Sequence, residues 1–223
     1  MPTLTDSGIA PPPPIDPILP EDGGGNNNDD HHGREQARSQ GAAIIGLFVM
    51  MCASLMTFAS FVSAMVVRRG LNSSDWRHLH VPSILWWNTI AILVSSVVLD
   101  LARRRFKRGI AAEAERLQFV RLWTAGTALG TWFLIGQCVA WKQLADSGFY
   151  LERNPSSAFF YVLTWTHAAH VVGALFAVGY VQYRVWRGEL TPARRNWVSV
   201  STIFWHFLDI LWLGIMALFV WWA

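Results

Sequence analysis

The chain has 223 residues, of which 52% are hydrophobic and 15% are charged, and 13 are tryptophans. The charged fraction lies well below the ~25% of soluble domains, so the composition excludes an ordinary soluble domain and indicates a membrane protein. The formal net charge of +3 combines an acidic amino-terminal region with a basic remainder. We interpret the basic surplus as a membrane-topology signal and not as a nucleic-acid-binding surface.

The first 40 residues differ from the rest of the chain. They carry seven acidic and two basic residues, together with runs of proline, glycine and asparagine. Because such a segment has too few apolar side chains to pack, we expect residues 1–40 to form a disordered acidic tail. Residues 41–223 contain five apolar runs that are each long enough to cross a bilayer. We therefore predict an all-α membrane domain, a bundle of five transmembrane helices at 41–67, 82–101, 122–141, 158–181 and 199–222.

The basic and aromatic residues predict how the bundle sits in the membrane. If the helices alternate in direction, the amino-terminal tail and the second and fourth connections share one side, which collects 13 of the 18 Lys and Arg residues. The positive-inside rule then places the amino terminus in the cytoplasm and the carboxyl terminus on the outer, periplasmic side. Met1–Ala10 does not resemble a signal peptide, so the first apolar run is expected to direct insertion. Tryptophans at the span ends, Trp123 among them, are expected at the membrane interfaces.

The connection after the second span, RRRFKRGIAAEAERLQFVR, is strongly basic. Basic side chains at the membrane surface attract anionic lipids by roughly 1 kcal/mol each. Asp100 precedes this run, and we expect it to form a local ion pair with Arg103 and Arg104. The candidates for contact with lipid head groups are Arg103, Arg104, Arg105, Lys107 and Arg108.

Asn88 in the second span and Gln137 in the third are amide side chains deep within apolar segments. At ~1.5 Å per residue, they lie about 21 and 24 Å from the cytoplasmic ends of their helices. Polar side chains within a bilayer tend to bond to neighbouring helices. The similar depths therefore predict an interhelical pair between the two amides.

The fourth span carries two histidines, His167 and His170, near its middle. Their spacing of three residues places them on one helix face, and an ionisable side chain at that depth costs at least ~2.5 kcal/mol unless it faces protein. His206 and Asp209 in the last span have the same spacing. Counting ~1.5 Å per residue across a ~30 Å core places His206 level with His170, and Asp209 level with His167. We therefore predict that spans four and five meet through these two pairs.

Three roles are open for the intramembrane histidines. They form a structural network that holds two helices in register, they belong to a proton relay with Asp209, or they are ligands of haem or a metal ion. Two histidines three residues apart on one helix make a poor pair of axial haem ligands. The sequence contains no G-x-S-x-G, HExxH or phosphate-loop pattern, so we expect no catalytic residues and no independent enzyme activity.

Four of the predicted spans each contain a different motif of polar and small residues. They are Asn88-Thr89 with Ser95-Ser96 in the second span, Leu129-Gly130 to Gly136-Gln137 in the third, His167 with His170-Val171 and Gly173 in the fourth, and Trp205-His206-Phe207 with Asp209 and Trp212 in the fifth. From Gly41 to its end, the chain with these motifs resembles subunit III of the haem-copper respiratory oxidases, in its five-helix bacterial form.

The resemblance implies an accessory subunit of a cytochrome c oxidase, a terminal oxidase that couples O2 reduction to proton pumping. Such a subunit binds no haem, copper or other metal itself, because these cofactors belong to its partner subunits I and II. The resemblance implies direct contact with subunit I and its stabilisation, further contacts with subunits II and IV, and association with a respiratory supercomplex. It also implies bound structural phospholipids and a multi-pass location in the bacterial plasma (inner) membrane.

Two positions depart from the pattern of this family. Its first span usually carries a Ser-Glu pair where this chain has Ser54 and Leu55, and its third span commonly carries a carboxylate at the position of Ala140. The loss of both carboxylates argues for a structural and lipid-binding role over a proton relay. The open alternatives are subunit III of a quinol oxidase, a subunit-III-like protein of a nitric oxide reductase complex, a haem-holding membrane anchor and a stand-alone membrane transporter or channel.

Overall fold

The structure of the chain is a computed structural model that describes residues 27–71, 83–109, 113–147, 155–187 and 195–222. These residues form five helices, which are α1 (Asn27–Leu71), α2 (Ser83–Arg108), α3 (Glu113–Asp146), α4 (Pro155–Trp186) and α5 (Arg195–Trp222). The predicted all-helical class and the predicted number of helices are therefore confirmed.

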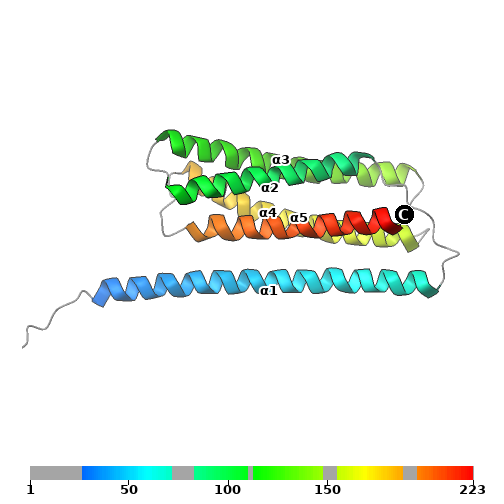
Figure 1. The fold of residues 1–223 in the computed structure, drawn as a ribbon, viewed down its shortest axis with the longest axis horizontal. Helices are drawn as coiled ribbons and strands as arrows, with labels where there is room; N and C mark the ends of the chain where they lie inside the picture. The colour runs from blue at the N-terminus through cyan, green and yellow to red at the C-terminus, as the bar shows by residue number, and fades with distance from the viewer. Residues whose placement is uncertain (1–26, 72–82, 110–112, 148–154, 188–194, 223) are drawn as a thin grey trace, which may run out of the picture.

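The helices lie side by side along one direction (Figure 1). α2 packs on α3, α3 on α4, α4 on α5 and α5 on α2, so these four helices close into a ring. α1 lies outside this ring and contacts α4 and α5. The start of α1, the end of α2, the start of α3, the end of α4 and the start of α5 lie at one end of the bundle, and the carboxyl-terminal end of α5 lies at the other (Figure 1).

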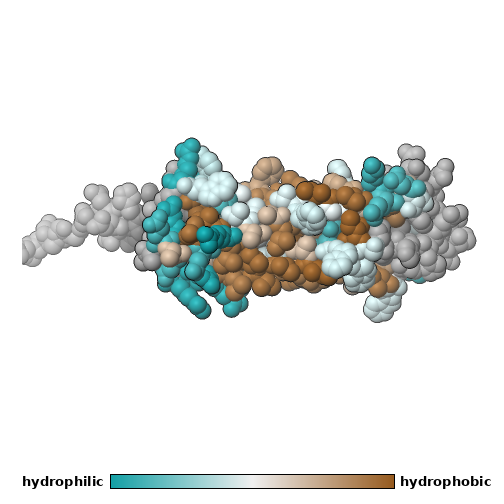
Figure 2. All heavy atoms as spheres, turned by 90° about the horizontal axis from the view of Figure 1, so that it is seen from above, coloured by the Kyte–Doolittle hydropathy of each residue, from teal (hydrophilic) through white to brown (hydrophobic). Residues whose placement is uncertain are grey.

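Four of the five helices are long and apolar enough to cross a membrane: α2, α4, and the segments Gly41–Leu71 of α1 and Asn196–Trp221 of α5. α3 is also long enough, with 34 residues, but threonines, glycines, tryptophans and Gln137 lower its mean hydropathy. Small residues and threonine suit helix contact in lipid, and α3 buries one side between α2 and α4. Seen from above, apolar side chains form a band between two hydrophilic ends (Figure 2).

The helix boundaries differ from the predicted spans in places. α1 begins at Asn27, so the backbone of residues 27–40 is helical where the composition predicts a disordered tail. Residues 1–26 of that tail, and Pro82 at the start of the predicted second span, lie outside the described residues. α2 extends past Leu101 to Arg108 and is followed by Gly109, whose φ of 108° is the left-handed conformation that commonly ends helices.

Close helix contacts on α3 depend on glycine. A Cβ atom at Gly126 would lie 2.6 Å from Leu99 Cγ of α2. One at Gly130 would collide with the Trp205 ring of α5, and one at Gly136 with the amide of Asn88. Small residues let backbones approach closely where apolar lipid provides no hydrophobic drive for association.

Candidate functional site

Polar side chains converge where α2 meets α5, and we call them the α2–α5 polar cluster: Ser96, Asp100 and Arg103 of α2 with His206 and Asp209 of α5. The Ser96 hydroxyl forms a short hydrogen bond with His206 Nδ1. His206 Nε2 lies 3.9 Å from Asp100 Oδ1. Arg103 Nη2 donates to the same carboxylate oxygen at 2.6 Å. The cluster therefore connects the middle of the bundle with the charged end of α2.

Asp209 is the deepest member of the α2–α5 polar cluster. Its side chain lies close to Ser96, and the residue is only 4% exposed. Neither carboxyl oxygen has a hydrogen-bond partner among the described residues. One turn further along α5, Trp212 Nε1 donates to Thr89 Oγ1 of α2 at 2.9 Å, which ends the row of polar contacts in the aromatic core.

The ion pair predicted for Asp100 is confirmed. Arg103 Nη2 and Arg104 Nε each lie 2.6 Å from one of its two oxygens. The predicted partners of His206, in contrast, are wrong. His206 faces Ser96 and Asp100 of α2, while Nδ1–H of His170 donates to the Thr166 carbonyl of its own helix at 2.7 Å.

His167 occupies an aromatic cage instead of a polar pair. Its ring lies 5.0 Å from that of Trp212 and tilts from it by 32°, and the ring of Phe133 meets it edge-on at 6.0 Å. Phe58 of α1 packs beside both His167, at 6.4 Å, and His170, at 5.7 Å. His167 is fully buried, and neither of its ring nitrogens has a hydrogen-bond partner among the described residues. His167 and Asp209, predicted to lie side by side, therefore share no hydrogen bond.

The helices of the predicted amide pair, α2 and α3, are in contact, but Asn88 and Gln137 do not hydrogen bond to each other. Asn88 and Gln137 are both buried, but Asn88 Nδ2 and both polar atoms of Gln137 have no hydrogen-bond partner in the described part of the chain. Asn88 packs instead against Gly136, the residue before Gln137. On the same pair of helices, the Ser95 hydroxyl donates to the Gly126 carbonyl at 2.7 Å.

The five basic head-group candidates all lie at the end of α2, but they differ in their contacts. Arg103 and Arg104 are paired with Asp100, and Arg105 hydrogen bonds to Gln118 at the start of α3. Lys107 and Arg108 are exposed. A polar pocket of about 270 Å³ opens here, lined by Arg105, Arg108, Gly109, Glu115 and Gln118.

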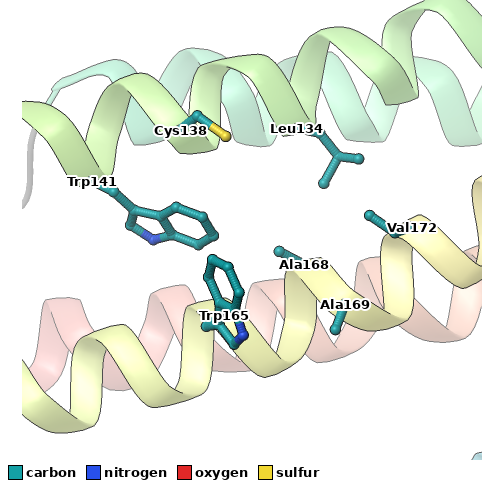
Figure 3. A pocket seen from close by; sticks show the side chains of 7 residues that line it. All are labelled: Leu134, Cys138, Trp141, Trp165, Ala168, Ala169 and Val172. Atoms are coloured by element: carbon teal, nitrogen blue, oxygen red, sulfur yellow. The ribbon is translucent and has the colours of Figure 1, made fainter.

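Two apolar hollows lie along the flanks of the bundle. The α3–α4 pocket, of about 260 Å³, is lined by Leu134, Cys138, Trp141, Trp165, Ala168, Ala169 and Val172. Figure 3 shows the rings of Trp141 and Trp165 at one end of it. These rings lie 5.1 Å apart, and the Trp141 indole donates to Thr164 Oγ1 at 3.0 Å. The α1–α5 groove, of about 480 Å³, is lined by Leu55, Phe58, Ala59, Val62, Ser63, Ile210, Leu211, Gly214, Ile215 and Leu218.

The two positions where the related family carries carboxylates have different surroundings. Leu55 is 54% exposed and lines the α1–α5 groove. Ala140 is fully buried in α3.

Trp123, expected at a membrane interface, is also fully buried, and it donates to the Val178 carbonyl of α4 at 3.0 Å. Within the described ranges, no three His, Cys, Asp or Glu side chains form a group that could hold a metal ion.

Comparison with known proteins gives one consistent result. The family model described as cytochrome c oxidase subunit III matches residues 32–223. Cytochrome c oxidase subunit 3 of Corynebacterium diphtheriae is 30% identical over 178 residues, which cover 77% of this chain and 83% of the relative. Probable cytochrome c oxidase subunit 3 of Nocardia farcinica is 27% identical over 175 residues (78% and 84%). Cytochrome bo(3) ubiquinol oxidase subunit 3 of Pseudomonas putida is 24% identical over 177 residues (78% and 83%).

Proposed function

Because the chain belongs to the cytochrome c oxidase subunit III family, we propose that it is the accessory subunit III of a cytochrome c oxidase in a bacterial inner membrane. It contacts subunit I directly and stabilises it, with subunit II, and subunit IV where one is present, as further partners. Haem and copper are carried by subunits I and II, and this chain holds no redox centre of its own. The observation that supports this role is the match of the subunit III family model to residues 32–223.

The contacts of His167 and His170 support a structural role for these two histidines, and those of His206 join two helices. His206 is engaged by Ser96 and Asp100 across the helix interface. His170 bonds to its own helix, and His167 is enclosed by aromatic rings. The polar contacts of His206 and His170 therefore lie on different helices, and His167 makes none among the described residues, whereas a pair of haem ligands must face a common site.

The bundle offers phospholipids both apolar and charged contacts. The α3–α4 pocket and the α1–α5 groove are lined almost entirely by apolar side chains, which suit acyl chains. The exposed Lys107 and Arg108 lie at the end of α2, where basic side chains attract anionic head groups. We assign this end, which the start of α1 shares, to the cytoplasm, since it gathers most of the basic residues.

Purification of the tagged chain under mild detergent conditions tests the proposal. We expect it to bring down a larger, haem-bearing subunit together with phospholipid that resists washing. The chain separated from that complex is expected to show no Soret absorbance. A Soret band that stays with the separated chain, or purification from its native membrane without any oxidase subunit, would contradict the proposal.

Subunit III of a quinol oxidase is the second candidate function. It is favoured by the similarity to the ubiquinol oxidase subunit of Pseudomonas putida over most of both chains. The purified complex separates the two candidates: oxygen consumption driven by reduced cytochrome c supports the first, whereas consumption driven only by a quinol supports the second.

A further inference from the structure

Asp209 presents an unusual combination of burial and connection. Both of its carboxyl oxygens are enclosed and without a hydrogen-bond partner among the described residues. A charge in such surroundings is strongly disfavoured, so a buried carboxyl group without a partner holds a proton if one can reach it. The question is whether a route for that proton exists.

Polar groups able to pass a proton lie between Asp209 and the charged end of α2. Ser96 lies close to Asp209 and hydrogen bonds to His206 Nδ1. A hydroxyl both donates and accepts hydrogen bonds, and an imidazole can take a proton at one ring nitrogen and release one at the other. His206 Nε2 in turn lies 3.9 Å from Asp100, whose partner Arg104 is 67% exposed.

We propose that the α2–α5 polar cluster is a proton-exchange path through which Asp209 takes up and releases a proton at the charged end of α2. A proton from solvent reaches His206 Nε2 directly, because the His206 side chain is 38% exposed, and the Asp100 carboxylate 3.9 Å away stabilises the positive charge that forms. His206 Nδ1 passes its proton to the Ser96 oxygen, and the Ser96 hydroxyl proton passes to the Asp209 carboxylate. The net result is one proton moved from solvent to Asp209, with the imidazole left as the other tautomer. The reverse transfers restore the starting state.

The groups around the path allow this assignment. From α2, the charged groups that face it are Asp100, Arg103 and Arg104. From α4, the titratable side chain of His167 packs on Trp212, one turn beyond Asp209. α1 between 41 and 67 and α3 between 122 and 141 contain no charged residue.

The path ends at Asp209. Beyond it stands Trp212, which is fully buried and hydrogen bonded to Thr89. Among the described residues, the polar contacts do not continue to the opposite end of the bundle. The α2–α5 polar cluster is therefore a proton-binding site that opens to one side, and not a channel through the membrane.

Infrared spectroscopy of the full-length chain in lipid nanodiscs tests the proposal. We expect a carbonyl stretching band of a protonated carboxylic acid that is absent in Asp209→Asn and shifted in frequency in Asp209→Glu. After transfer to D2O, the band should shift in the unchanged protein, and His206→Leu should slow this shift by about 10²-fold, a typical contribution of a positioned proton-transfer group. His170→Leu removes a histidine from outside the path and should leave the rate unchanged.

Two results would overturn the proposal: a spectrum that does not change with either Asp209 variant, and an exchange rate that is equal in His206→Leu and the unchanged protein. A purely structural Asp209 would alter thermal unfolding without an exchange rate that depends on His206. If Asp209→Asn does not fold, the test rests on Asp209→Glu. A carbonyl stretching band that keeps its frequency in this variant contradicts the assignment of the band to Asp209. The experiment needs no oxidase partner, so its failure is distinguishable from failure of the proposed function.

Discussion

The α2–α5 and α3–α4 interfaces differ in how their polar contacts are arranged. Between α2 and α5, polar contacts follow one another from Thr89 with Trp212 to Asp100 with His206. Between α3 and α4, the hydrogen bonds include those from Trp123 to the Val178 carbonyl and from Trp141 to Thr164, and an apolar pocket of about 260 Å³ lies beside Trp141. Hydrogen bonds fix the rotation and register of two helices, whereas an apolar hollow only requires space. The first interface is therefore held by polar contacts between α2 and α5, and the second leaves an apolar hollow that we propose as an acyl-chain site.

Replacing one tryptophan from each interface should separate their contributions most strongly. Trp212→Ala removes a fully buried ring that packs against His167 and hydrogen bonds to Thr89, so we expect a loss of about 3–5 kcal/mol in unfolding free energy. The matched change Trp165→Ala, at a ring that is 65% exposed beside the pocket, should cost under ~1 kcal/mol. Denaturation in mixed micelles measures both. Equal losses would contradict the contrast between the interfaces.

A double-mutant cycle between Ser96 and His206 should show that the α2–α5 contact is energetically coupled. Ser96→Ala removes the hydroxyl that bonds to His206 Nδ1, and interhelical hydrogen bonds in membranes contribute about 0.6 kcal/mol, with a maximum near 1.7. The same cycle between Ser96 and His170 is the control, because His170 bonds to its own helix. Additive losses for Ser96 and His206 would mean that the contact contributes nothing.

Filling the α3–α4 pocket should change lipid retention more than stability. Ala169→Leu places a larger apolar side chain in the pocket, and we expect a stability change within ~0.5 kcal/mol because the residue is exposed. Native mass spectrometry of the purified chain should show fewer retained phospholipids. Ala125→Leu, at an exposed position on α3 outside the pocket, is the matched control. Unchanged lipid retention in Ala169→Leu would argue against the pocket as a lipid site.

The outer end of the α2–α5 polar cluster should contribute least to the unfolding free energy. Arg104→Gln removes a pair with Asp100 in which the arginine side chain is 67% exposed, and such surface pairs on one helix contribute about 0.3–0.5 kcal/mol. Raising the salt concentration should reduce the difference from the unchanged protein. A loss above ~1 kcal/mol would show that this arginine supports more of the cluster than its own ion pair.

The sequence was sufficient to predict the helices, because the length of an apolar run determines whether it crosses a bilayer. It also predicted the Asp100 ion pair, since residues three and four apart on a helix are neighbours whatever surrounds them. The start of α1 was not predicted, because composition alone does not show that the backbone of residues 27–40 continues the helix.

The partners of the buried polar residues were predicted wrongly for a geometrical reason. Counting residues gives the depth of a side chain, but its direction depends on how the helix is rotated about its axis and on which helices are its neighbours. α5 packs on both α2 and α4, and His206 faces α2. Successive residues of a helix are about 100° apart around its axis, so Asn88 meets Gly136 instead of the adjacent Gln137. The burial of Trp123 was not predicted, because a position at the end of an apolar run does not reveal the indole acceptor on α4.

α1 is 45 residues long, which corresponds to roughly 67 Å at ~1.5 Å per residue, about twice the ~30 Å thickness of the hydrocarbon core. Only the segment from Gly41 to Leu71 is apolar enough to lie within that core. The preceding turns continue the same helix beyond the apolar segment. A fluorophore attached near the start of α1 would report the tilt of α1 against the four-helix ring, because a small rotation of a long helix displaces its end further than its middle.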